Sequence, residues 1–258
     1  MVLTAGMATV ASNVLALYVF TLQQQFPAIA GHLISASILS APAAIIMAKI
    51  IVPEADTPAT LGRNVRPHYE RETSLFEAII NGANAGVKLI VGIAALLLAV
   101  LGLVALVDLG LGWLGGHVNA LNGWQVDWSL KGLMGYLFYP FTLVIGVPVQ
   151  DAWTAARIIG ERLIVTEVAS YQDLAVALQN NVIIHPRTTV IVTYALCGFA
   201  HLASMAIFVG GIAALAPNQT RTLAKLGWRA LVAATLACLM TACMAGTFFT
   251  GGSVLLGK

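Results

Sequence analysis

One carboxylate, one imidazole and one hydroxyl group stand out because each belongs to a residue inside a long apolar stretch. Glu167 occurs in IVTEVASY, and His201 and Ser204 occur in CGFAHLASM. An ionised carboxylate in such surroundings requires hydrogen-bond donors or a positive charge. Three interpretations of Glu167 stay open: an ion pair with Arg162 or Arg187, contact with the hydroxyl groups of a solute or with a cation, and, without any partner, a carboxyl group that carries a proton.

His201 and Ser204 are three residues apart, which places both side chains on one face of a helix. Imidazole and hydroxyl groups supply both donors and acceptors, so the pair suits the hydroxyl groups of a sugar. The alternative is a histidine that only packs and hydrogen-bonds between helices. For the neighbouring pair Glu161 and Arg162 we expect a solvated or paired charge at the mouth of a hairpin.

The composition identifies the class of protein that positions these groups. Of the 258 residues, 59% are hydrophobic and only 9% are charged, and the mean hydropathy is +0.88. Soluble domains carry about a quarter charged residues, so the sequence predicts an all-α polytopic membrane protein. A net charge of +2 is too small and too scattered for a nucleic-acid surface. The three cysteines lack metal-ligand spacing, and hydrolase, metalloprotease and nucleotide-binding motifs are missing, so we expect no enzyme, no metal and no cofactor.

Two apolar segments are interrupted near their centres. Residues 193–217 are long enough to cross a bilayer, but they contain Cys197, Gly198, His201 and Ser204. Polar groups at that depth normally face a cavity, a partner helix or a solute. Residues 3–22 are interrupted by Thr9, Ser12 and Asn13. Here two interpretations stay open: helix packing through small residues, and a break that offers backbone carbonyls to a cation.

The remaining pattern divides the chain into five predicted parts. They are two spans with the first one broken (1–52), a cytoplasmic loop and interfacial helix (53–88), a scaffold span at 89–107 with a periplasmic connection (89–128 together), a re-entrant hairpin region (129–187), and a broken helix at the solute site with a final span (188–258). Lys and Arg cluster in the loop after the second span and at 218–229, whereas the Trp-rich connection lacks them. The positive-inside rule therefore places both clusters in the cytoplasm.

Several long blocks resemble one transporter family. They are YALCGFAHLASMAIFVGGIAALAP, GERLIVTEVASY, AGMATVASNVLALYV and SAPAAIIMAKIIVPE. These blocks are similar to the C-terminal part of the concentrative nucleoside transporters, in the family's order and over nearly the whole chain. The resemblance implies a partial inverted-repeat fold with re-entrant hairpins and broken transmembrane helices that meet at the solute site. It also implies a homotrimer in the inner (cytoplasmic) membrane that takes up nucleosides by symport with sodium or protons.

The resemblance also assigns roles to residues of the apolar stretches. It places Thr166, Glu167 and Val168 at the tip of a hairpin, where the family usually has Asn-Glu-Phe. Glu167 matches the family's ribose-binding glutamate, Ser204 matches its ribose-binding serine, and Phe199 matches an aromatic residue nearby.

Two further places in the chain depart from the family pattern. The family has Asn where this chain has His201, and Gly-Ser where it has Ser12 and Asn13, a place linked to the sodium site. The predicted substrate-binding residues are therefore Glu167, Ser204, His201, Thr166 and Phe199, and the predicted ion-binding residues are Ser12 and Asn13. A neutral imidazole in place of an amide is the simpler interpretation of His201, and a titratable group in the site is the alternative.

The family's first three spans and first hairpin have no counterpart in this sequence. That hairpin reads the nucleobase with a G-Q-T-E-A-P type motif, and repeat order independently indicates that the first repeat lacks its hairpin. We therefore expect this polypeptide not to transport by itself. Three explanations stay open: a separately encoded N-terminal half completes it, the assigned start lies too late in the reading frame, or the chain is a relic. The alternatives are a non-transporting membrane protein that keeps the fold for binding or interaction, and a related solute symporter with altered specificity.

Overall fold

The structure, a computed structural model, describes residues 1–258 except 56, 58–60, 63, 65–71 and 251–258, and except the side chain of Asn13. The predicted cytoplasmic loop of 53–88 therefore lies partly outside the described residues. The described part contains helices and no strand: α1 (Val2–Ala8), α2 (Ser12–Leu22), α3 (Ile29–Ile51), α4 (Leu75–Asn122), α5 (Leu130–Val144), α6 (Val149–Ile164), α7 (Glu167–Gln179), α8 (Pro186–Leu196), α9 (Leu202–Leu215), the 3-10 turn η1 (Pro217–Gln219) and α10 (Thr220–Thr247). The all-α class is confirmed.

In the described part of the chain, three stretches of helix are long and apolar enough to cross a membrane. They are Ile29–Ile51, Leu75–Asn122 and Pro217–Thr247. Breaks divide the predicted first span into α1 and α2, and residues 186–215 into α8 and α9. The predicted broken helices are therefore present at both positions.

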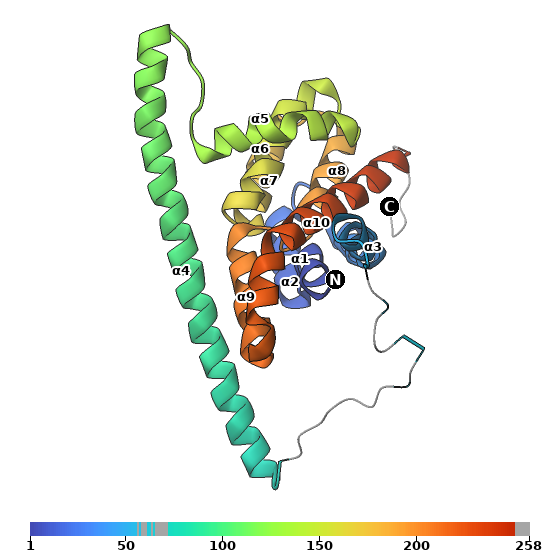
Figure 1. The fold of residues 1–258 in the computed structure, drawn as a ribbon. Coiled ribbons are helices and arrows are strands. Elements are labelled where there is room, and N and C mark those ends of the chain that lie inside the picture. The colour runs from blue at the N-terminus through green and yellow to red at the C-terminus, as the bar shows by residue number, and fades with distance from the viewer. Residues whose placement is uncertain (56, 58–60, 63, 65–71, 251–258) are drawn as a thin grey trace.

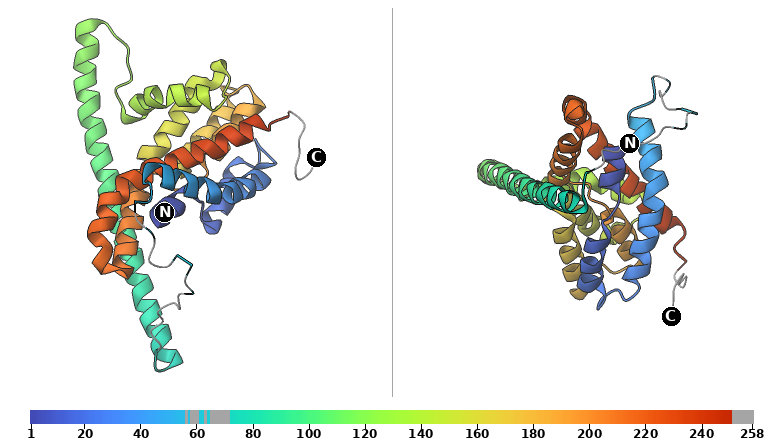
Figure 2. Two further views of the ribbon diagram at one scale, coloured as in Figure 1. Left: turned by 45° about the vertical axis from the view of Figure 1, so that its right-hand side comes forward. Right: turned by 90° about the horizontal axis from the view of Figure 1, so that it is seen from below.

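Helix α4 is longer than the predicted span. It runs unbroken for 48 residues, about 70 Å at the usual rise, and stands beside the other helices, which it contacts mainly through α9 (Figures 1 and 2). It begins where the Ser74 hydroxyl accepts the backbone N–H of Glu77 (3.2 Å) and ends at Gly123, whose φ of 68° is left-handed. Helix α4 includes residues 108–122, most of the glycine-rich stretch that was predicted as a connection. A backbone in lipid must satisfy its hydrogen bonds internally, which favours continuation of the helix.

The breaks in the two broken helices lie against each other. The Cys238 sulfur of α10 is 4.0 Å from the Ala8 carbonyl oxygen at the end of α1 and 3.8 Å from the Cys197 carbonyl oxygen at the end of α8. A Cβ atom on Gly198 would lie 2.9 Å from the Ala8 oxygen and 2.7 Å from the Cys238 sulfur. Glycine at position 198 therefore allows the two broken segments to approach.

Helices α5, α6 and α7 form the predicted hairpin region. Helix α5 packs along α6, and a Cβ on Gly160 would lie 2.8 Å from the backbone of Met134 in α5, so glycine permits this close packing. The chain then leaves α6 at Val165 and passes through an extended Thr166 (φ −151°, ψ 158°) into α7, which packs back against α6. This turn places the first residue of α7 in the protein interior.

A buried carboxylate joins the start of α6 to the start of α8. Asp151 is fully buried, and its two oxygens accept the backbone N–H groups of Ile184 (3.1 Å) and His185 (3.0 Å) and the Thr188 hydroxyl (2.7 Å). These donors lie at the N-terminus of α8, where the helix dipole favours a negative charge. Asp151 thus positions α8 at one end, while the site described next lies at the other.

Candidate functional site

Glu167 lies where three segments of the chain meet. It is the first residue of α7 and is only 2% exposed. Its Oε1 accepts the Tyr18 hydroxyl of α2 at 2.6 Å, and its Oε2 lies 3.1 Å from Nε2 of His201. Among the described residues, Glu167 makes no ion pair with Arg162 or Arg187, so that interpretation is wrong. The carboxylate is held by a phenol and an imidazole instead.

His201 forms the first turn of α9 as well as contacting Glu167. Its Nδ1 accepts the backbone N–H of Ser204 (3.2 Å), and the Ser204 hydroxyl accepts the backbone N–H of His201 (3.1 Å), which makes a reciprocal capping box. Because Nδ1 is an acceptor, the ring hydrogen lies on Nε2, which faces the carboxylate. The helix cap thus sets the tautomer of His201 and leaves the hydrogen on Nε2, 3.1 Å from the carboxylate of Glu167.

The contact between His201 and Glu167 is close without being well aligned. Nε2 of His201 and Oε2 of Glu167 are both buried, and neither makes an aligned hydrogen bond among the described residues. A carboxylate offers about four lone-pair positions, and Tyr18 takes one of them with good geometry. Glu167 therefore keeps acceptor capacity for a further donor.

Ser204, which was predicted to face a solute together with His201, is bonded to the backbone instead. It is 1% exposed, and its hydroxyl donates to the carbonyl oxygens of Phe199 and His201 while it accepts the cap hydrogen bond. The spacing of three residues does bring His201 and Ser204 together, but they bond to each other. Ser204 can reach a solute only when its hydroxyl leaves these backbone partners.

The other predicted residues lie around this cluster or outside it. Thr166 precedes α7 and is partly buried, and the Phe199 ring, also partly buried, lies 6.0 Å from the His201 ring. Ser12 is exposed at the first residue of α2, and the side chain of Asn13 lies outside the described part. No group of three His, Cys, Asp or Glu side chains in the described residues is placed to hold a metal ion.

Sequence reasoning missed two tyrosines that support the cluster. The Tyr18 and Tyr171 rings stack with centroids 4.3 Å apart and an interplanar angle of 27°, and both side chains are buried. The Tyr171 hydroxyl donates to the carbonyl oxygen of Thr193 in α8 (3.0 Å). Tyr171 follows Glu167 by four residues on one helix face, which was a usable signal. Tyr18 is 149 positions from Glu167, and no local pattern indicates that pairing.

The expectation for Glu161 and Arg162 is half wrong. Glu161 is paired, with Lys131 of α5 (2.9 Å). Arg162 is fully buried and is neither solvated nor paired with a carboxylate in the described residues, and its guanidinium donates to the carbonyl oxygen of Ala195. Successive residues of an α-helix are about 100° apart around its axis, so Glu161 can reach the rim while Arg162 reaches the interior.

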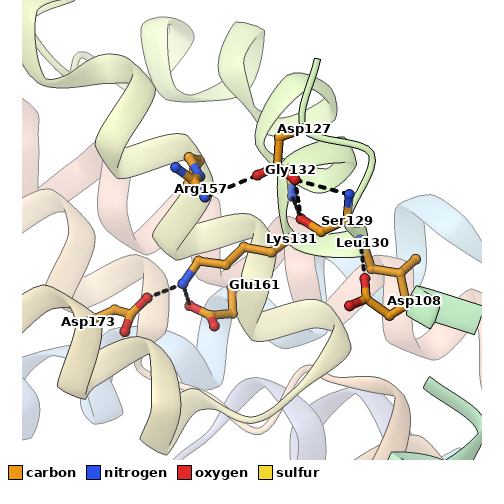
Figure 3. Close-up of polar contacts among 9 residues, drawn as sticks. All are labelled: Asp108, Asp127, Ser129, Leu130, Lys131, Gly132, Arg157, Glu161 and Asp173. Carbon is orange, nitrogen blue, oxygen red and sulfur yellow. Dashed lines mark hydrogen bonds and ion pairs between the residues drawn. The ribbon is translucent and has the colours of Figure 1, made fainter. Parts of the chain in front are cut away.

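The charged residues on the rim form a separate network that holds the hairpin on α5 (Figure 3). The Lys131 ammonium group contacts Glu161 of α6 and Asp173 of α7, and Arg157 contacts Asp127 at 3.2 Å. Hydrogen bonds from Ser129, with the Arg157 guanidinium nearby, lower the pKa of Asp127. These charges position the hairpin that carries Glu167, but they do not contact Glu167.

Comparison with known proteins identifies the family. Residues 32–246 match the family model described as "Na+ dependent nucleoside transporter C-terminus". The chain belongs to this family. It is a family of transporters and not of enzymes, and its description supports a coupling ion. The resemblance to concentrative nucleoside transporters is thereby confirmed, and the chain is a multi-pass membrane protein.

Individual relatives agree with this assignment. The chain is 35% identical to "Solute carrier family 28 member 3" of Mus musculus over 95% of its own length and 35% of the relative's. It is 35% identical to "Nucleoside permease NupC" of Helicobacter pylori over 96% of the chain and 56% of the permease.

Solved structures agree as well. An outward-facing variant of CNTnw superposes with a TM-score of 0.78 at 33% identity, over 95% of the chain and 56% of CNTnw. An inward-facing substrate-bound CNTnw gives a TM-score of 0.71 at 33% identity, over 98% of the chain and 58% of CNTnw. The chain thus spans between about a third and somewhat more than half of the relatives that it matches.

Proposed function

We propose that this chain is the C-terminal part of a transporter that takes up nucleosides by cation symport across the inner (cytoplasmic) membrane. The observation that carries the proposal is the buried Glu167, held by Tyr18 and His201 at the turn between α6 and α7 and beside the break between α8 and α9. Burying a carboxylate within membrane segments costs free energy, and residues of this kind typically mark the path of a solute or an ion. The family description and the name of the H. pylori permease support nucleosides as the solute.

The proposed solute contact is between ribose and Glu167. Ribose hydroxyl groups are donors, and Glu167 keeps acceptor positions beyond the one taken by Tyr18. His201 contacts the carboxylate, Thr166 directly precedes Glu167, and the Phe199 ring lies 6.0 Å from the His201 ring. Ser204 also binds the solute when its hydroxyl gives up its hydrogen bond to a backbone carbonyl oxygen and donates to the solute instead. Because the nucleoside is uncharged, its binding does not require Glu167 to change its charge.

We propose sodium as the coupling ion, with Ser12, Asn13 and the carbonyl end of α1 as its site. Three points favour sodium over a proton. The family description names Na+, and carbonyl oxygens at the end of a broken membrane helix are suitable ligands. In His201, the alternative proton carrier, the nitrogen that would take up a proton is Nδ1, which already accepts the backbone N–H of Ser204.

The complete assembly is proposed to be a homotrimer whose protomers include the part of the relatives that this chain does not match. That part is proposed to be encoded separately and to supply the wall of the site that reads the nucleobase. The most apolar stretch of α4 contains no buried residue, and its exposed surface is suited to contact with lipid or with neighbouring subunits.

The test is uptake of radiolabelled uridine and adenosine into nucleoside-uptake-deficient cells. The chain is expressed alone and together with the reading frame immediately upstream, and membrane insertion is checked by fractionation. We expect uptake only with the second component, dependence on sodium, and loss of uptake in Glu167→Gln. Glu54→Gln, which changes an exposed carboxylate paired with Lys49, is the matched control.

Two results would contradict the proposal. Uptake that persists in Glu167→Gln would show that the site is elsewhere. No uptake under any condition, despite confirmed insertion, would favour a membrane protein that keeps the fold for binding or interaction without transport.

A further inference from the structure

Arg162 is the largest fully buried side chain in the described residues, and it lacks an acidic partner there. It lies in the last turn of α6, with no exposed surface, and its guanidinium donates through one nitrogen to the carbonyl oxygen of Ala195. Its Nε and its second terminal nitrogen have no hydrogen-bond partner among the described residues. Burying a guanidinium without a counter-ion costs several kcal/mol, so a residue in this position needs another source of negative potential.

The end of α8 is that source. Helix α8 ends at Leu196 among buried residues, and the last four carbonyl groups of a helix have no partner within it. The Tyr171 hydroxyl satisfies Thr193, and the Arg162 guanidinium satisfies Ala195. The carbonyl end of a helix also carries about half a negative charge. Arg162 is therefore paired with a helix terminus and not with a side chain.

Carbonyl oxygens at the end of a broken membrane helix are also the groups that bind coupling cations in transporters. We propose that Arg162 is a resident cation that occupies this position at the end of α8. By filling it, Arg162 keeps inorganic cations out and fixes the break at 197–201, which places His201 against Glu167. Arg162 is thus a positioning residue, and it acts through the backbone of α8.

The other broken helix provides the contrast. The Ala8 carbonyl oxygen at the end of α1 lies 4.0 Å from the neutral Cys238 sulfur of α10, whereas Arg162 of α6 donates to the end of α8. Among the described hydrogen bonds, a charged donor is therefore present at the end of α8 and not at the end of α1. Under this proposal the two neighbouring breaks differ in whether an inorganic cation can occupy them.

Cys197 provides a local measure of the proposed role. It directly follows α8 and is 1% exposed, so alkylation by N-ethylmaleimide requires the break to open. The full chain is purified in detergent, the modification of Cys197 is followed by mass spectrometry, and circular dichroism monitors helix content. The variants are Arg162→Met, which keeps most of the length without charge, Arg162→Lys, which keeps the charge, and Arg162→Ala, which leaves space.

We expect Arg162→Met to raise the alkylation rate of Cys197 by about tenfold or more, as local opening becomes easier, and Arg162→Lys to stay within a few-fold of the wild type. In Arg162→Ala, millimolar guanidinium or sodium should restore protection, whereas choline at the same ionic strength should not. Arg221→Met is the matched control, because it makes the same change at an exposed position in the first turn of α10.

Three results would overturn the proposal: unchanged Cys197 reactivity in Arg162→Met, equal loss of protection in Arg162→Lys and Arg162→Met, or no difference between guanidinium and choline in Arg162→Ala. If Arg162→Met loses its helix content, the lysine variant alone decides. The alkylation measurement requires no transport, so a negative result there does not contradict the proposed function. Likewise, loss of uptake in the cell assay does not contradict the proposed role of Arg162.

Discussion

The double role of His201 makes a prediction whose size follows from the structure. His201→Ala removes a helix cap, worth about 1 kcal/mol, and a donor facing a buried carboxylate, worth roughly 1–3 kcal/mol. The sum is about 2–4 kcal/mol. In a chain of this size, 1 kcal/mol corresponds to roughly 2–4 °C, so the melting temperature in detergent should fall by about 10 °C.

Two further substitutions separate the cap from the donor. Asn has one acceptor and one donor, so His201→Asn keeps the cap and a hydrogen bond to Glu167 and should cost less than about 1 kcal/mol. Asp caps a helix equally well but places a second negative charge near Glu167. His201→Asp should therefore destabilise at least as much as His201→Ala.

The assay is thermal unfolding of the purified chain, followed by circular dichroism, with all four proteins in one detergent. Equal melting temperatures for His201→Asp and the wild type would refute the assigned contact with Glu167. Equal melting temperatures for His201→Asn and His201→Ala would refute the assigned cap.

Other substitutions test the neighbouring contacts in the same unfolding assay. Tyr18→Phe removes only the hydroxyl that donates to the buried carboxylate and should cost about 2 kcal/mol, while Tyr136→Phe, at an exposed position, should be neutral. Gly198→Ala places a Cβ 2.9 Å from a carbonyl oxygen and should destabilise by roughly 1–3 kcal/mol; a neutral effect would show that the two breaks are not in close contact. Asp151→Ala leaves several donors at the start of α8 unsatisfied and should cost about 3 kcal/mol, whereas Asp151→Asn should cost less. Asp127 has a lowered pKa in the folded protein, so its contribution is present above its unfolded pKa and is lost as the pH falls through its folded pKa. Because its side chain is 43% exposed, that contribution is below about 1 kcal/mol, and Asp127→Asn should reduce the loss of stability below about pH 4.

The sequence by itself determined the class of protein and the order of its elements. Low charge and long apolar runs depend only on composition and local order, and they require an all-α membrane protein because lipid offers no partner to an unpaired backbone group. The interruptions near residues 9–13 and 197–201 are likewise local features, and the structure has breaks at 9–11 and 197–201. The position of Glu167 inside an apolar stretch was enough to mark it as a buried carboxylate in need of partners.

The tertiary structure decided which partners these groups have. Tyr18 and Glu167 are 149 residues apart, and Arg162 reaches a carbonyl oxygen 33 residues away, so neither contact has a signature in sequence spacing. The Ser204 hydroxyl, expected to face a solute, bonds to the backbone at the start of its own helix. A buried polar group bonds to whatever donor or acceptor the packing of distant helices places within about 3 Å, and that packing follows from the fold as a whole.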